Sequence, residues 1–575
     1  MTPEEQNAKV AYFSMEIALD PAIPTYSGGL GMLAGDMLRS AADLQLPIVA
    51  VTLVHRKGYF RQRLDAAGNQ TADPDPWDPA TKLRLVNASA SVVVEGRQVR
   101  VQAWCYEVVG ISGYKVPVYL LDSDVPANAD WDRTLTDTLY GGDVRYRICQ
   151  EALLGIGGIG ILRSLGLQEV AVYHMNEGHS SFLTLALLEE QLSARQATEI
   201  TEADVQAVRR QCVFTTHTPV PAGHDQFTWD LVRAVLGESC AQQLDRTACC
   251  REGLLNMTYL ALRFSHYVNG VAMRHEEVSQ SMFPNYPIHA ITNGVHARTW
   301  ASASFRELYD RHIPEWRRDC DYLRYAVGIP LREIKDAHAR AKSALLAEVQ
   351  QRTGAALDPA VLTIGFARRA AAYKRADLLF SDVERLAGIA KSAGAFQVIY
   401  GGKAHPHDEA GKAAIQRVFE EASRLKDRVR VVYVENYDWT WGALITAGVD
   451  VWLNTPQRPQ EASGTSGMKA AVNGVPSLSI LDGWWVEGCF EGTTGWAIGH
   501  DGEIRTEEAR AEVESLYVKL EHQIIPMFYQ RPDAFAEVMR SAIAINGSFF
   551  NTQRMVQQYE ANAYFPEALT RTAGE

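Results

Sequence analysis

Short apolar runs alternate with longer amphipathic segments along the whole chain. In the first half, the pattern predicts strands at residues 10–15, 48–54, 101–106, 213–216 and 289–292. It predicts helices at residues 32–44, 145–165 and 254–267. Alternation of strands and helices is typical of parallel sheets that are covered by helices on both faces.

The second half repeats this alternation. Strands are predicted at residues 362–367, 397–400, 429–434 and 449–453, with helices such as 333–350 and 410–425 between them. The simplest fold is therefore an α/β protein with two doubly wound, Rossmann-like lobes, 1–293 and 294–575. We place the joint after Asn293-Gly294, because glycine lets the chain turn. An active site is expected between the lobes, outside the carboxyl ends of the strands.

Size and charge narrow the function. A chain of 575 residues with 47% hydrophobic content is larger than a single hydrophobic core usually supports, so we expect two or more domains. The net charge of −13 argues against nucleic acid or an anionic membrane as the main partner. The first nine residues are polar, and the longest glycine-broken apolar run, 153–162, is too short to span a bilayer. Eight cysteines without a Cys-x-x-Cys pair fit reduced thiols. We expect a cytoplasmic protein, and the sequence leaves a homo-oligomer open.

Two common site patterns are discounted. The glycines of residues 155–160 have the spacing of a dinucleotide fingerprint, but they follow a predicted helix, whereas the fingerprint needs a strand before it. His405, His407 and Asp408 offer metal ligands, as do His174 and His179, without the helical i, i+4 spacing of a zinc hydrolase. We therefore predict neither a dinucleotide site nor a required metal.

Residues 461–469 read EASGTSGMK and carry the strongest chemical signal. We interpret this segment as a phosphate-binding turn that opens a helix, with Lys469 in the first turn of that helix. Small residues let backbone N–H groups approach phosphate oxygens at a positive helix end. A lysine amine can bond to an aldehyde, and pyridoxal phosphate carries both an aldehyde and a phosphate. From composition alone, an ordinary helix cap and a solvated lysine remain the commoner explanation.

This segment resembles the cofactor-attachment motif of the glycogen and α-glucan phosphorylases, most closely the short microbial type. Other segments match that family in the same order: YFSME at 12–16, SGGLG at 27–31, NEGH at 176–179, THTP at 216–219, TNG at 292–294 with Trp300, RRAAAYKR at 368–375, GGKA at 401–404, ENY at 435–437, LNTP at 453–456 and DGWW at 482–485. The matches span most of the chain. None is specific alone, but their shared order is.

The resemblance implies a two-lobed glycosyltransferase-B fold whose last helix, within residues 535–563, packs back on the first lobe. It implies an α-1,4-glucan phosphorylase that uses inorganic phosphate to release α-D-glucose 1-phosphate with retention. The cofactor would be pyridoxal 5′-phosphate, whose phosphate relays a proton to the substrate phosphate. The implied cofactor-binding residues are Lys469, Gly464, Thr465, Ser466, Arg368, Lys374, Tyr437 and Trp300.

The same resemblance implies the residues that bind substrate and carry the reaction. The implied catalytic residues are Lys469, Arg369, Lys374, His217 and Glu461. The implied substrate-binding residues are Gly28, Gly29, Leu30, Glu177, His179, His217, Asn293, Arg369, Tyr373, Glu461, Ser463 and Gly464. In this scheme Arg369 and Lys374 hold the reacting phosphate, His217 and Asn293 hold the glucose hydroxymethyl group, and Glu177 positions groups without attacking.

Each assignment has a plainer alternative, since charge runs are usually solvated and lone histidines are usually structural. Position 368 is arginine where the family usually has lysine, which keeps the charge but changes the donor geometry. The stretch around Tyr140 to Asp143 matches the family poorly, so the glucan preference stays open. A sugar-nucleotide glycosyltransferase would share the architecture. A non-catalytic glucan-binding relative would be expected to lose Lys469, Arg369 or Lys374, and all three are present.

Overall fold

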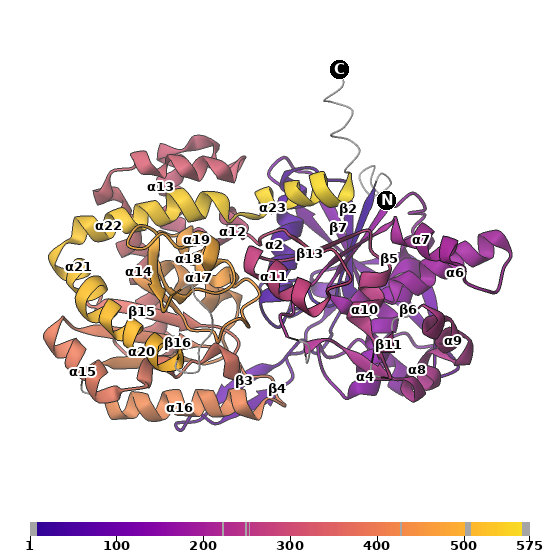
Figure 1. The fold of residues 1–575 in the computed structure, drawn as a ribbon, viewed down its shortest axis with the longest axis horizontal. Helices are drawn as coiled ribbons and strands as arrows, with labels where there is room; N and C mark the ends of the chain where they lie inside the picture. Colours follow the sequence, from indigo (N-terminus) through magenta and orange to yellow (C-terminus); the bar gives the residue numbers. More distant parts are fainter. Residues whose placement is uncertain are drawn as a thin grey trace, which may run out of the picture.

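The computed structural model describes residues 8–220, 223–247, 250–251, 253–425, 428–500 and 508–565. Most of the polar N-terminal segment, residues 1–7, lies outside these ranges. Two twisted sheets lie side by side, each covered by helices (Figure 1). We call the part around the nine-stranded sheet the first lobe and the part around the six-stranded sheet the second lobe.

The first lobe contains a mixed sheet in the order β14-β13-β9-β8-β1-β2-β7-β6-β5. Its strands are β1 Val10–Ser14, β2 Ile48–Leu53, β5 Arg84–Val94, β6 Arg97–Val109, β7 Lys115–Asp122, β8 Val172–Asn176, β9 Cys212–Thr215, β13 Tyr267–Gly270 and β14 His289–Ala290. The strands from β14 to β7 pair in parallel. The predicted parallel pairing is confirmed for these strands, whereas at the other edge of the sheet β6 is antiparallel to β5 and β7. A two-residue turn with φ of 50° at Glu95 and 75° at Gly96 joins β5 to β6 as a tight hairpin.

The first-lobe helices are α2 Gly29–Asp43, α3 Asp130–Arg133, α4 Val144–Ala152, α5 Gly158–Ser164, α6 Leu183–Arg195, α7 Glu202–Arg209, α8 Trp229–Leu236, α9 Glu238–Arg246, α10 Met257–Arg263 and α11 Met273–Met282. A π-helical segment, Leu153–Gly157, joins α4 to α5, which confirms a helix instead of a dinucleotide loop. A side chain at Gly155 would lie 2.5 Å from the Leu183 nitrogen, so this glycine permits close packing.

The helix predicted at residues 254–267 is wrong at both ends. Leu254–Asn256 forms strand β12, which pairs with β10 (Gln226–Thr228) and β11 (Cys250–Arg251). The Asn256 side chain accepts hydrogen bonds from the backbone nitrogens of Thr258 and Tyr259, so it caps α10 and sets where the helix begins. Tyr267 already belongs to β13.

The second lobe contains an all-parallel sheet in the order β17-β16-β15-β18-β19-β20. Its strands are β15 Leu362–Ala367, β16 Phe396–Gly401, β17 Arg430–Val434, β18 Val451–Asn454, β19 Ser477–Ile480 and β20 Gly495–Ile498. The helices are α12 Ala297–Trp300, α13 Ala303–His312, α14 Leu331–Thr353, α15 Val383–Ser392, α16 Glu409–Leu425, α17 Trp439–Gly448, α18 Thr465–Ala471, α19 Trp485–Gly488, α20 Glu508–Lys519, α21 Ile525–Gln530 and α22 Pro532–Ser541. The four strands predicted in this half are confirmed to within two residues.

In the part of the chain that the structure describes, two segments that connect the lobes lie next to each other. Val295 donates to the Phe550 carbonyl at 3.1 Å, and Thr552 donates to the Val295 carbonyl at 3.0 Å. A side chain at Gly294 would lie 2.3 Å from the Asn551 backbone, so glycine is needed here for close approach of two chain segments. We keep the division after Asn293 as a proposal.

After the second of these segments, helix α23 (Thr552–Tyr559) packs on α2 of the first lobe (Figure 1). Met555, Val556 and Tyr559 join the apolar cluster that also contains Leu38 of α2. Ser40 and Thr552 hydroxyls lie 2.6 Å apart. The C-terminal part of the chain therefore completes the core of the first lobe.

A two-stranded arm leaves the first lobe and lies against the second (Figure 1). It consists of β3 (Arg61–Leu64) and β4 (Gln70–Asp73), which pair antiparallel. Within the described ranges, no helix is long and apolar enough to cross a membrane.

Candidate active site

The predicted cofactor lysine lies on α18, at the carboxyl side of the second-lobe sheet. Gly464 precedes the helix with a φ of 88°, a conformation that suits glycine. Thr465 and Ser466 begin the helix and are partly exposed. Helix α18 has 7 residues, and Lys469 is the fifth of them. It therefore lies in the last turn, and our prediction that it lies in the first turn is wrong.

The Lys469 amine is buried and forms no ion pair with any residue that the structure describes. Its Nζ lies 3.7 Å from the centre of the Trp300 ring, and the residue is 8% exposed. Burial lowers the pKa of Lys469 to about 8, although Asp36 on α2 acts in the opposite direction. Asp36 itself accepts a hydrogen bond of 2.6 Å from the Trp300 indole. A substantial fraction of this amine is therefore neutral near pH 8, as a group that attacks an aldehyde must be.

Next to this helix, two cations converge on one buried carboxylate. Lys374 Nζ donates to both Glu461 oxygens at 2.8 Å, and Arg368 Nη2 donates to Glu461 Oε2 at 2.5 Å. Arg368 also donates to Asn454 at the end of β18. Although burial raises it, Arg368 and Lys374 lower the pKa of Glu461 to about 2. Glu461 is therefore ionised, and the two cations are held at the carboxyl ends of β15 and β18.

Arg369 and Tyr373 extend this cationic group toward the first lobe. Arg369 is exposed and donates to the Tyr373 hydroxyl at 3.4 Å. Burial raises the Tyr373 pKa, but Lys374 and Arg369 outweigh it and lower that pKa below its usual value. The pKa of Arg369 is raised, chiefly by Tyr373 and also by Glu16 of the first lobe. Arg369 therefore lies where charges of both lobes reach it.

In the first lobe, Glu177 and His217 form a second polar set. Glu177 Oε2 accepts a hydrogen bond from the backbone nitrogen of His217 at 2.8 Å and another from the Thr218 hydroxyl at 3.0 Å. His217 Nε2 lies 2.7 Å from Asn176 Oδ1, so Asn176 orients the imidazole. Burial lowers the pKa of His217 to about 4, which leaves the ring neutral at neutral pH. A neutral imidazole can hydrogen-bond a sugar hydroxyl.

His179 and Asn293 lie around this second set. His179 Nε2 lies 3.2 Å from Asp225 Oδ2. Asn293 is 4% exposed, its backbone nitrogen donates to the Val271 carbonyl, and its Oδ1 has no partner among the described residues. Ser463 Oγ and Arg368 Nε are also buried, and neither atom has a hydrogen-bond partner among the described residues. Buried polar atoms are rarely left unpaired, so these three atoms favour a polar ligand.

The glycine loop, residues 27–31, leads into α2 and contacts Glu16, which lies two residues after the end of β1. Gly28 precedes α2, whose first residues are Gly29 and Leu30. Glu16 accepts hydrogen bonds from the backbone nitrogens of Ser27 at 2.6 Å and Gly28 at 3.3 Å. It also accepts from the Tyr140 hydroxyl at 3.0 Å. We did not assign a role to Glu16 from sequence, although it ends a matched motif directly after a strand.

Two aromatic side chains that we predicted as cofactor walls lie near each other. A side chain at Gly442 would lie 3.1 Å from the Tyr437 hydroxyl and 3.8 Å from the Trp300 ring. Asp36, which accepts a hydrogen bond from Trp300, was also missed, although an acidic residue between the apolar residues of α2 was a signal for it. The structure thus groups the predicted residues into three sets. The cationic set is Arg368, Arg369, Tyr373, Lys374 and Glu461, the lysine set is Lys469, Trp300 and Tyr437, and the first-lobe set is Glu177, His179, His217 and Asn293.

Comparison with known proteins identifies the family. A model of the carbohydrate phosphorylase family matches residues 238–494. Maltodextrin phosphorylase of Thermococcus litoralis is 40% identical over 97% of this chain and 71% of its own length. Glycogen phosphorylase of Mycobacterium tuberculosis is 38% identical over 98% of this chain and 72% of its own. Glycogen phosphorylase of Aquifex aeolicus is 35% identical over 97% of this chain and 86% of its own.

The fold and the site thus define a two-lobed glycosyltransferase. The chain belongs to the carbohydrate phosphorylase family, which confirms the resemblance inferred from its motifs.

Proposed function

We propose that this protein is an α-1,4-glucan phosphorylase that uses pyridoxal 5′-phosphate and transfers glucose from a glucan end to inorganic phosphate. One observation carries the proposal: among the described residues the buried Lys469 amine has no ion-pair partner, and two cations, Arg368 and Lys374, share the carboxylate of Glu461, which precedes the lysine helix. Neither a sugar-nucleotide transferase nor a glucan-binding protein needs that combination.

The cationic set supplies the charge that phosphate groups require. Arg369 is exposed toward the first lobe, so we assign it to the reacting phosphate together with Lys374. Arg368 is fixed by Asn454 and Glu461, and its unpartnered Nε is assigned to the cofactor phosphate. Cations at fixed positions stabilise charge that develops in a transition state, because they need no reorganisation during the reaction.

The first-lobe set supplies hydrogen bonds for the glucose ring. His217 is neutral and oriented by Asn176, so it is suited to bind a hydroxyl. Asn293 Oδ1 is a buried acceptor without a partner in the described chain, and we assign it to the same hydroxymethyl group. Glu177 holds the His217 backbone and therefore positions this set. Glu461, with Ser463 and Gly464, is assigned to the far side of the ring.

The residues around α18 fit pyridoxal phosphate. Lys469 offers an amine of lowered pKa, Trp300 offers a ring face next to it, and Ser463 Oγ and Arg368 Nε are unsatisfied donors within the described residues. When bound, the cofactor would supply a phosphate that exchanges a proton with the substrate phosphate. The chain's own part is to attach it through Lys469 and to compensate the two phosphates with Arg368, Arg369 and Lys374.

Incubation with maltodextrin is expected to release α-glucose 1-phosphate only when inorganic phosphate is present. The physical reason is that the cations can bind an inorganic phosphate as the acceptor of glucose. Hydrolysis would instead need a pair of carboxylates at the scissile bond, and we assign no such pair. The measurement is the amount of glucose 1-phosphate and free glucose formed with and without phosphate. Equal sugar release without phosphate would support hydrolysis, and turnover only with a sugar nucleotide would support the transferase alternative.

The capture of pyridoxal phosphate by the cofactor-free protein is expected to depend on pH through Lys469. Only the neutral amine attacks an aldehyde, and its pKa is about 8. The capture rate should rise about tenfold per pH unit below pH 8 and level off above it, whereas an ordinary lysine would continue to about pH 10.4. Stopped-flow absorbance of the bound cofactor measures this rate. A rate that still rises beyond pH 10 would show that burial does not lower this pKa.

A further inference from the structure

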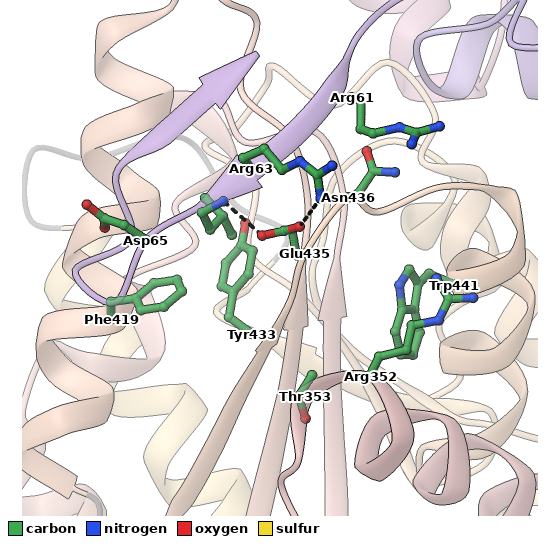
Figure 2. Close-up of a pocket in the computed structure, with 11 residues that line it drawn as sticks. Arg61, Arg63, Asp65, Arg352, Thr353, Phe419, Tyr433, Glu435, Asn436 and Trp441 are labelled. Carbon is green, nitrogen blue, oxygen red and sulfur yellow. Dashed lines mark hydrogen bonds and ion pairs between the residues drawn. The ribbon is translucent and has the colours of Figure 1, made fainter. Parts of the chain in front are cut away.

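Two of the contacts between the lobes differ in kind. One lies at the arm, where Arg63 and Glu435 are 3.5 Å apart, are about half exposed, and border a cavity of about 620 Å³ (Figure 2). The arginines that line this cavity are outnumbered by the carboxylates in it and beside it, which are Asp65, Asp73, Asp75, Glu348 and Glu435. The cavity therefore does not select a ligand by charge. The other contact is buried, and it lies where the two segments that connect the lobes meet.

At this buried contact, Arg554 joins the two connecting segments. It is the third residue of α23, and its backbone nitrogen donates at 2.9 Å to the side chain of Asn551, which caps the helix. Through Nη1 it donates to the Thr292 carbonyl at 2.5 Å, and through Nη2 to the Asn293 carbonyl at 2.9 Å. One planar guanidinium therefore holds two consecutive carbonyls of the other segment.

The remaining hydrogen bonds of Arg554 also go to uncharged oxygens. Its Nε donates to the Phe549 carbonyl at 3.1 Å, and its Nη1 donates to Gln558 Oε1 at 2.9 Å. Burial lowers the pKa of Arg554 to about 10, although Glu487 acts in the opposite direction. The group is still protonated at neutral pH. A buried cation with uncharged acceptors costs stability, which favours a role beyond stability for this arginine.

Glu487 of the second lobe holds the same turn through a side chain. Its Oε2 accepts from the Thr292 hydroxyl at 2.8 Å, and its Oε1 accepts from the Met273 backbone nitrogen at 3.0 Å. Glu487 lies on α19, which begins within the DGWW motif. Thr292 is therefore bonded to the second lobe through its hydroxyl and to α23 through its carbonyl.

This turn contains the residue that we assign to the glucose hydroxymethyl group. The Asn293 backbone nitrogen donates to the Val271 carbonyl at 3.0 Å, and the Asn293 carbonyl accepts from Arg554. Its buried Oδ1 has no partner among the described residues. A side chain on a fixed backbone loses less freedom when a ligand binds, so the Asn293 acceptor is preorganised for a hydroxyl.

We propose that Arg554 is a positioning residue for sugar recognition, which holds the Asn293 backbone so that Asn293 can bind the glucose hydroxymethyl group. The inference rests on the proposed function and gives Arg554 no contact with the sugar. Arg554 lies on the helix that covers α2. The glucose site of the first lobe is therefore complete only when α23 has packed in place.

The test compares α-glucose 1-phosphate with its 6-deoxy analogue, which lacks the hydroxymethyl hydroxyl. Each is supplied as glycosyl donor with maltodextrin as acceptor, and the release of inorganic phosphate is measured. The unmodified protein is expected to prefer glucose 1-phosphate at least about 100-fold in kcat/KM. The reason is that the analogue leaves buried polar groups of the site without a partner.

Arg554→Met, which keeps an apolar stem but has no N–H donor, should reduce this preference at least about fivefold. Arg554→Lys keeps a cation but cannot hold two carbonyls in one plane, so it should reduce the preference several-fold. The KM for inorganic phosphate should change less than about twofold, because the hydrogen bonds of Arg554 do not reach the cationic set. Arg540→Met is the matched control. Arg540 is partly buried and donates to the Ile329 carbonyl at 3.3 Å, and its loss should change neither quantity.

A double variant tests whether Arg554 acts through Asn293. Asn293→Ala alone should reduce the preference at least as strongly as Arg554→Met. Adding Arg554→Met to Asn293→Ala should then reduce the preference no further, because the group that Arg554 positions is already absent. Additive effects of the two changes would mean that Arg554 acts independently of Asn293, and the proposal would be wrong.

An unchanged preference in Arg554→Met, including an equal loss of activity with both donors, would overturn the proposal. So would a phosphate KM that rises as much as the preference falls, because Arg554 would then only hold the lobes together. If circular dichroism shows that Arg554→Met does not fold, Arg554→Lys decides by the same criteria. Failure of the proposed function would appear differently, as absence of phosphate release from glucose 1-phosphate by the unmodified protein, and it would overturn this inference as well.

Discussion

Replacing Lys374 by alanine is expected to lower kcat/KM for phosphate by roughly 100-fold to 1,000-fold, the effect typical of losing one fixed donor to a transition state. Lys374 Nζ bonds both oxygens of Glu461 at 2.8 Å. Without it, only Arg368 and Arg369 of this cationic set remain to compensate a buried carboxylate and two phosphates. Initial rates at several phosphate concentrations measure the effect, and cofactor absorbance should largely remain.

Lys412→Ala is a suitable control for this variant. Lys412 also lies in the second lobe, but it pairs with Glu409 on α16 at the surface, so its loss should leave the phosphate kinetics unchanged. If Lys374→Ala behaves like this control, Lys374 does not bind phosphate and our placement of the cationic set is wrong.

Replacing Lys469 by alanine should remove the absorbance of attached pyridoxal phosphate and reduce activity by at least about 1,000-fold, because the reacting phosphate loses its proton partner. The two uses of the cofactor can then be separated in the unmodified protein. Reduction of the link to Lys469 with borohydride should spare substantial phosphorolysis. Refilling the pocket with pyridoxal that lacks its phosphate should abolish most of it.

Complete inactivation by reduction, with the fold intact, would contradict this proposal. It would mean that the link to Lys469 has to open during turnover, as in amino-acid chemistry. Circular dichroism of the reduced protein provides the control for folding.

The second-lobe sheet was easier to predict than the first. Its strands β15 and β16 are buried on both faces and read as continuous apolar runs. Strand β8 was missed because buried His174 and Asn176 interrupt its apolar pattern, and their partners, Thr215 and Ser14, are distant in sequence. The hairpin β5–β6 was missed because its Glu95-Gly96 turn is a weak signal.

The site shows the same limit of local patterns. The sequence motifs identified Glu461 and Lys374 as site residues. Their ion pair could not be predicted, because Lys374 lies in the loop after β15 and Glu461 in the loop after β18, and only the fold brings the two loops together. Glu16 acts through Ser27, Gly28 and Tyr140, and its influence on Arg369 exists only once the lobes meet. Arg554 could not be predicted at all. It donates to the carbonyls of Thr292 and Asn293 from a helix that follows the whole second lobe.

The return of α23 to the first lobe has a consequence for biosynthesis. The apolar side of α2 is covered by residues 552–559, which a ribosome adds only after it has made every strand of the second lobe. About 510 residues separate the end of α2 from this cover, so at roughly 5–20 residues per second the surface waits about 25–100 s before its cover exists. The first lobe is therefore begun first and finished last, and its growing chain carries an exposed apolar face that chaperones can recognise.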